Sequence, residues 1–178
     1  QLLKSDQLDV RKVFIDINDI AKPMESYAVL DLFAGAGGMT LGFQQAGLRP
    51  VASVEINDFA SRTHRNNFPG CWHFSGDIHG FDPTSWLEGC EVDSIQVVVG
   101  GPPCQGFSVA GRRDPNDERN RLFYEFIRVV DEVKPWYVVM ENVPGILTMQ
   151  KGAVQEAIKD AFAEIGYPDM SVANLESA

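Results

Sequence analysis

The chain has few cysteines and no long apolar run, and each shortage excludes a class of protein. Its three cysteines are widely spaced in 178 residues, so neither a disulfide framework nor a zinc site is expected. No apolar run approaches the roughly 18 residues of a membrane-spanning helix. Residues 1–9 are polar and lack a signal-peptide pattern. These features favour a protein of the reducing cytoplasm.

Positive charge is also scarce. Twenty-five acidic residues outnumber 15 basic ones, which gives a net charge of −10. Binding to nucleic acid over the whole surface is therefore excluded, because phosphates are neutralised by lysine and arginine. A local cluster remains in one segment, made of Arg112, Arg113, Arg119 and Arg121. Any contact with nucleic acid is expected either at this cluster or through another part of the protein.

Histidines are few as well, and they show no metal-ligand spacing with cysteines or carboxylates. His64, His73 and His79 are expected to be structural or exposed, and no metal site is predicted.

Short apolar runs alternate with helical patterns, which predicts an α/β fold with a doubly wound, mostly parallel sheet of the Rossmann-like type. Residues 1–26 are expected to be an N-terminal extension, and residues 27–178 form one domain. The expected strands are 27–33, 50–55, 72–74, 95–99 and 136–140, with a sixth beginning in 170–175. The expected helices are 39–46, about 58–67, a short one within 82–90, 119–133 and 152–165. The aromatic residues of 119–133 recur at helical spacing and are expected in the core.

A cysteine follows the fourth predicted strand directly. Gly100-Gly101-Pro102-Pro103 ends the strand and places Cys104 at its carboxyl end, where ligands of open α/β sheets bind. A thiol on a stiff Pro-Pro elbow, followed by the flexible Gly106-Phe107-Ser108, suits a covalent catalyst. Cys71 and Cys90 are expected only to pack.

A glycine-rich turn follows the first predicted strand and opens a helix, which is the start of a nucleotide-binding unit. Thr40 stands where the third glycine of GxGxxG would fall, and this disfavours a dinucleotide. Glu55 ends the second strand, about 20 positions past the glycines, which is the position that binds ribose hydroxyls. Ile56 is placed to pack on the base, and Asn57 or Asp58 to cap the next helix.

Several motifs resemble those of the cytosine-C5 DNA methyltransferases over about residues 27–175. The segment 102–108 is similar to the family's nucleophile motif, and 31–38 to its S-adenosylmethionine (SAM) motif. Gly76-Asp77-Ile78 resembles its adenine-reading segment, and Glu141-Asn142-Val143 its second catalytic motif.

The resemblance implies roles for particular residues. Cys104 would add to C6 of a flipped cytosine, Glu141 would hold N3 and the exocyclic amine, and Asn142 would orient the strand end. SAM, released as S-adenosylhomocysteine, would contact Phe33, Ala34, Gly35, Gly37, Gly38, Glu55, Ile56, Asp77, Ile78 and Pro103. DNA would be contacted by Gln105, Ser108, Arg112 and Arg113.

The family continues into an arginine motif, a final strand, a target-recognition region and a terminal helix. The sheet is therefore expected to be truncated before its last strand. The expected partners are DNA and a C-terminal half or separate subunit that carries the recognition region. The resemblance also implies a prokaryotic, nucleoid-associated protein and a link to restriction-modification.

Two other functions remain open. One is methylation of cytosine in tRNA, although Gly106-Phe107-Ser108 favours the DNA enzymes. The other is a catalytically silent SAM-binding regulatory module, against which the presence of both Cys104 and Glu141 argues.

Overall fold

The computed structural model describes residues 27–89, 92–103, 121–142 and 153–173. The predictions made for residues 1–26 therefore lie outside the described residues. The same holds for those made for Cys90, Cys104, Gln105, Ser108, Arg112, Arg113 and Arg119.

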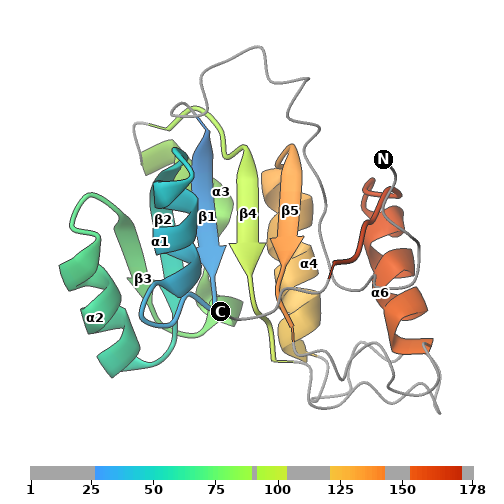
Figure 1. The fold of residues 1–178 in the computed structure, drawn as a ribbon, viewed down its shortest axis with the longest axis horizontal. Helices are drawn as coiled ribbons and strands as arrows, with labels where there is room; N and C mark the ends of the chain where they lie inside the picture. The colour runs from blue at the N-terminus through green and yellow to red at the C-terminus, as the bar shows by residue number, and fades with distance from the viewer. Residues whose placement is uncertain (1–26, 90–91, 104–120, 143–152, 174–178) are drawn as a thin grey trace, which may run out of the picture.

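Five strands form one parallel sheet (Figure 1), in the order β3-β2-β1-β4-β5. They are β1 (Ala28–Leu32), β2 (Arg49–Glu55), β3 (Trp72–Ser75), β4 (Val97–Gly100) and β5 (Tyr137–Met140). Because β1 lies between β2 and β4, the strand order reverses at its carboxyl end, which is where such folds bind ligands. The predicted doubly wound α/β fold is confirmed.

The expected sixth strand is not seen within residues 170–173, the part of that segment that the structure describes. Ser171 there makes only an isolated bridge. Met170 packs against the hydrophobic core instead of extending the sheet.

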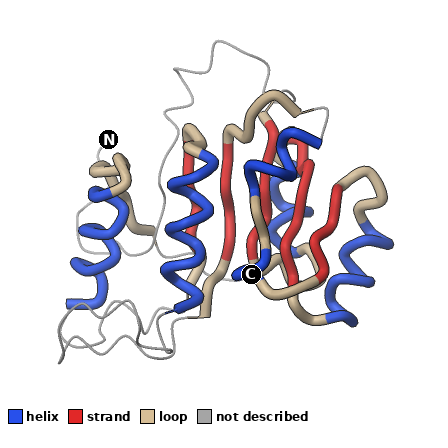
Figure 2. The backbone as a smooth tube through the Cα atoms, turned by 180° about the vertical axis from the view of Figure 1, so that it is seen from behind, coloured by secondary structure: helices blue, strands red, loops and turns tan. Residues whose placement is uncertain are grey.

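Helices cover both faces of the sheet (Figures 1 and 2). The elements are α1 (Gly38–Gln45), α2 (Asp58–Asn67), the 3-10 turn η3 (Ile78–Gly80), α3 (Pro83–Gly89), α4 (Arg121–Val133) and α6 (Ala153–Glu164). The helix α1 packs on one face, and α3, α4 and α6 pack on the other. No helix among these described elements is long and apolar enough to cross a membrane.

The alternation of side chains along β1 divides the core into two layers. Leu30 and Leu32 face the larger layer with α4 and α6, while Tyr27 and Val29 face the smaller layer beside α1. Both faces are apolar because both are covered by helices, which explains the short β-branched runs in the sequence. The aromatic residues of α4 lie in the larger layer, as predicted.

Helix ends follow local chemistry. Asn57 caps α2 by accepting hydrogen bonds from the N–H groups of Phe59 and Ala60, both at 3.0 Å. Gly166 follows α6 with a positive φ of 101°. These caps explain why most predicted bounds agree with the structure to within two residues.

Candidate active site

The glycine-rich turn lies at the carboxyl end of β1. Phe33 has a φ of 59°, which is rare for a residue with a side chain and typical of functional sites. A Cβ on Gly37 would lie 2.3 Å from a ring carbon of Phe68, so only glycine fits there. Gly37 is also the N-cap of α1 and offers no side-chain hydrogen bond to the helix. The turn therefore places backbone without side chains at the carboxyl ends of the strands, where a ligand can approach closely.

Glu55 joins this turn to α2. Its Oε2 accepts a hydrogen bond from the N–H of Gly35 (2.8 Å), and its Oε1 accepts one from the N–H of Asn57 (2.7 Å). Each carboxylate oxygen can accept a further bond, so the side chain is oriented without being saturated. Ile56 follows with 66% of its surface exposed. The predicted ribose and base contacts thus lie side by side at the edge of the sheet.

Asp77 is the N-cap of η3, beside the end of β3. Its Oδ1 accepts from both the backbone N–H (3.0 Å) and the ring Nδ1 (2.6 Å) of His79. The backbone N–H of His79, and then its ring, lower the pKa of Asp77, which stays an ionised acceptor at neutral pH. Ile78 points into the core and is 3% exposed. The contact of His79 with Asp77 was not predicted from the sequence. An aspartate whose side chain accepts from the backbone N–H two positions later is, however, the pattern of an Asx-turn.

The ends of β4 and β5 meet at the same edge. The N–H of Glu141 donates to the carbonyl of Gly100 (2.9 Å), and Nδ2 of Asn142 donates to the carbonyl of Pro102 (3.0 Å). A Cβ on Gly101 would lie 2.9 Å from Oε2 of Glu141. The backbone of residues 100–102, just before Pro103, therefore lies against both predicted catalytic residues that follow β5.

A buried polar network lies under the glycine-rich turn, and it was not predicted from the sequence either. Oγ1 of Thr40 donates to Oδ2 of Asp31 (2.6 Å) and contacts Nε2 of His64 (2.8 Å), and all three residues are fully buried. Since a hydroxyl has one hydrogen, His64 must donate from Nε2. Burial raises the pKa of Asp31 to about 6, and burial, followed by the charge of His73, lowers the pKa of His64 to about 4.

Removing the Thr40 hydroxyl should destabilise the fold in a pH-dependent manner. We expect Thr40→Val to lower the free energy of unfolding by about 1–3 kcal/mol at neutral pH, because Asp31 loses a charge-assisted hydrogen bond. The hydrogen bond from Thr40 lowers the pKa of Asp31, so it favours the ionised form. The loss should therefore be larger above the folded pKa of about 6 than below it.

Urea denaturation at about pH 5 and about pH 7.5 measures this difference. In the wild type, the raised pKa of Asp31 means that its contribution to stability falls as the pH rises from about 4 to about 6. Thr40→Ser keeps the hydroxyl and serves as the control. An equal loss at both pH values would contradict this assignment.

Other titratable groups fit structural roles. Burial raises the pKa of Cys71 to about 12, so its thiol is inert and packs as predicted. Burial lowers the pKa of His73, whose Nδ1 is hydrogen-bonded to Ser53. Across residues 27–89, 92–103, 121–142 and 153–173, no cluster of histidine, cysteine and carboxylate groups could hold a metal ion.

The parallel sheet, whose strand order reverses beside the glycine-rich turn, defines an α/β protein of the doubly wound class. Within that class, the chain belongs to the C-5 cytosine-specific DNA methylase family, whose sequence model matches residues 27–174. The resemblance seen in the motifs is thereby confirmed.

Similar proteins include the type II methyltransferase M1.HphI of Haemophilus parahaemolyticus, 41% identical over 80% of this chain and 39% of its own length. M.DdeI of Desulfomicrobium norvegicum is 40% identical over 78% of this chain and 34% of its own length. The crystal structure of an E. coli prophage protein described as a DNA modification methyltransferase superposes with a TM-score of 0.64 at 34% identity, covering 78% of this chain and 38% of that one. The chain thus spans less than half the length of these relatives.

Proposed function

We propose that the protein transfers a methyl group from SAM to C5 of cytosine in DNA. The observation that supports this most directly is the packing of Gly101 and Pro102, which follow β4, against Glu141 and Asn142. This packing brings the backbone before Cys104 to the second catalytic motif. The glycine-rich turn and Glu55 lie at the same edge of the sheet, where they would hold the cofactor.

The residues at this edge fit SAM. Glu55 has acceptor capacity left for the two ribose hydroxyls, and Asp77 is an ionised acceptor for the amine of adenine. Apolar contact with the adenine ring would come from Phe33 and Ile56. Ile78 was also expected at the ring, but it faces the core with 3% of its surface exposed, so it would anchor the turn that carries Asp77 instead. The turn residues Ala34, Gly35, Gly37 and Gly38, together with Pro103, would line the remainder of the site. Bound SAM supplies an electrophilic methyl group.

Loss of the Glu55 carboxylate should weaken SAM binding. We expect Glu55→Ala to cost about 1–3 kcal/mol of binding free energy, because hydrogen bonds from the ribose hydroxyls to a charged group are lost. Isothermal titration calorimetry measures the change. Glu88→Ala, on the exposed surface of α3, is the matched control and should bind normally. An unchanged affinity in Glu55→Ala would contradict the ribose assignment.

The chain's own residues account for the activation of cytosine. The thiolate of Cys104 forms a bond to C6, and the electron pair of the C5–C6 double bond makes C5 nucleophilic. Glu141, protonated or sharing a proton with N3, relieves the negative charge that develops on the ring. After methylation, a base such as water removes the C5 proton, and elimination breaks the bond from sulfur to C6.

Asn142 would hold the elbow before Cys104 through the carbonyl of Pro102. The target cytosine must leave the duplex to reach these groups. Gln105, Ser108, Arg112 and Arg113 would contact the DNA around the flipped base.

We further propose that another segment, in the same polypeptide or in a separate subunit, reads the DNA sequence. The relatives are more than twice as long as the part they share with this chain. The net charge of −10 also provides little attraction for phosphates. Such a protein would act at the nucleoid.

Transfer of radiolabelled methyl groups from SAM tests the function, with DNA and tRNA as substrates and with and without the C-terminal segment. We expect labelled DNA once that segment is present. Labelled tRNA alone would favour the tRNA enzyme, and SAM binding without any transfer would favour a silent regulatory module. A normal rate on DNA without the segment would show that it is not needed.

A further inference from the structure

An arginine on α4 reaches across to the turn that carries Asp77. All three nitrogens of the Arg128 guanidinium donate hydrogen bonds. Nε donates to Glu125 (2.7 Å), Nη1 to both oxygens of Glu132 (3.0 and 3.2 Å), and Nη2 to the backbone carbonyls of Ile78 (3.0 Å) and Phe81 (3.1 Å). Arg128 therefore links α4 to a turn about 50 positions earlier in the sequence.

Besides Arg128, the turn is held by its own backbone hydrogen bonds and by the bond from the N–H of Gly76 to the carbonyl of Glu55 (3.0 Å) just before Asp77. The 3-10 segment η3 is three residues long. Its first residue, Ile78, and its C-cap, Phe81, are anchored in the core, with 3% and 2% of their surfaces exposed. Because residues three apart in a 3-10 turn project on the same side, the two side chains hold the same side of the turn. Nη2 of Arg128 binds the backbone carbonyls of these same two residues and so adds a contact from α4 that fixes the turn further.

The platform that carries Arg128 is rigid. The core face of α4 includes Phe126, Val129 and Val130, all fully buried against the sheet. Glu125 and Glu132 lie about one turn to either side of Arg128 and hold its guanidinium by charge-assisted hydrogen bonds. The position of Nη2 is thus set by the helix and by both carboxylates.

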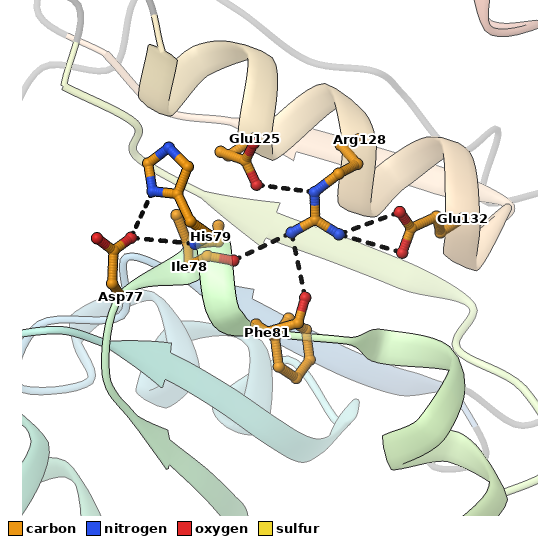
Figure 3. Close-up of polar contacts among 7 residues, drawn as sticks. All are labelled: Asp77, Ile78, His79, Phe81, Glu125, Arg128 and Glu132. Carbon is orange, nitrogen blue, oxygen red and sulfur yellow. Dashed lines mark hydrogen bonds and ion pairs between the residues drawn. The ribbon is translucent and has the colours of Figure 1, made fainter. Parts of the chain in front are cut away.

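The orientation of the turn determines where the Asp77 carboxylate points. Figure 3 shows Asp77 and His79 together on the turn, with Arg128 approaching it from α4. Both donors to Oδ1 of Asp77 come from His79, so the carboxylate is fixed to the turn. Within the described part of the chain, Oδ2 receives no hydrogen bond, and the side chain is 56% exposed. Oδ2 is therefore the atom available to a ligand.

We propose that Arg128 is a positioning residue for cofactor selection, which holds the turn so that Asp77 accepts a hydrogen bond from the 6-amino group of adenine. A 6-oxo purine presents an acceptor to the carboxylate at the same place and is rejected, because neither group can donate. This inference rests on the proposed function, since it requires the cofactor at this edge.

The test compares the dissociation constants of S-adenosylhomocysteine and its 6-oxo analogue S-inosylhomocysteine by calorimetry. Wild-type protein should prefer the amine by about 10- to 100-fold. Asp77→Ala should remove that preference. Arg128→Met should lower the ratio of the two constants about tenfold, because the carboxylate is no longer held in line with the amine. The ratio does not depend on the fraction of protein that is folded.

Two further variants complete the design. Arg128→Lys keeps the charge but has only three donors, so it should also lower the ratio and covers the case in which Arg128→Met does not fold. Arg49→Met, an exposed arginine at the start of β2, should leave the ratio unchanged.

The outcomes separate this inference from the proposed function. If both Arg128 variants weaken the two ligands by the same factor, Arg128 is merely structural and the inference is overturned. If wild-type protein binds both ligands equally, Asp77 does not read the amine and the inference fails, while the proposed function stands. If wild-type protein binds neither ligand, the proposed function fails and the inference fails with it.

Discussion

Replacing Cys104 by serine should abolish covalent capture of DNA that contains 5-fluorocytosine. Wild-type protein, with the C-terminal segment and SAM present, should form a complex that survives denaturing electrophoresis. The fluorine at C5 cannot leave as a cation, so the final elimination stalls with sulfur still bonded to C6. A serine hydroxyl is a far weaker nucleophile than a thiolate at neutral pH, so Cys104→Ser should give no complex and no methyl transfer.

The other two cysteines provide matched controls. Cys71 is buried with a pKa of about 12, so it has no nucleophilic role at neutral pH. Cys71→Ser and Cys90→Ser should therefore both keep adduct formation. A full yield of adduct from Cys104→Ser, or its loss in Cys71→Ser with the fold intact, would refute the assignment of the nucleophile.

Glu141→Gln should reduce methyl transfer by about 10²- to 10⁴-fold, the usual contribution of a positioned acid or base. Glutamine can still accept from the exocyclic amine and donate to N3. However, it cannot transfer a proton to N3 as the thiolate adds. SAM affinity should stay close to that of the wild type, because Glu141 follows β5, whereas the proposed cofactor residues other than Pro103 lie at the ends of β1, β2 and β3. Single-turnover methyl transfer and calorimetry measure the two quantities separately.

Gly101 provides an independent test of the same carboxylate. A Cβ at this position would lie 2.9 Å from Oε2 of Glu141. Gly101→Ala should therefore displace the carboxylate and slow transfer by up to about 100-fold. If both changes act through this one group, the double variant should be little slower than Glu141→Gln alone. Fully additive losses, or an unaltered rate in Glu141→Gln, would count against the role of Glu141.

The strands and the strand-end residues could be predicted from local sequence. The run 97–99 is apolar throughout because the sheet is covered on both faces, and Asn57 caps α2 through its own neighbours. Parallel strands place their carboxyl ends at one edge, so Glu55 and Glu141 could be assigned to the same site before their contacts were known. The expected sixth strand, not seen in the described residues 170–173, shows the limit, since a short apolar segment does not reveal whether it pairs or packs.

The sequence by itself determined the order of the elements, the edge at which the site lies and the residue types available there. Only the tertiary structure decided which side chains meet, as in the pairs Thr40 with His64, Asn142 with Pro102 and Arg128 with Ile78. Local patterns arise from the periodicity of one segment, which specifies the face of a helix or strand but not the angle and register at which two segments pack. A hydrogen bond between groups 24, 40 or 50 positions apart requires that angle and register to within a few tenths of an ångström.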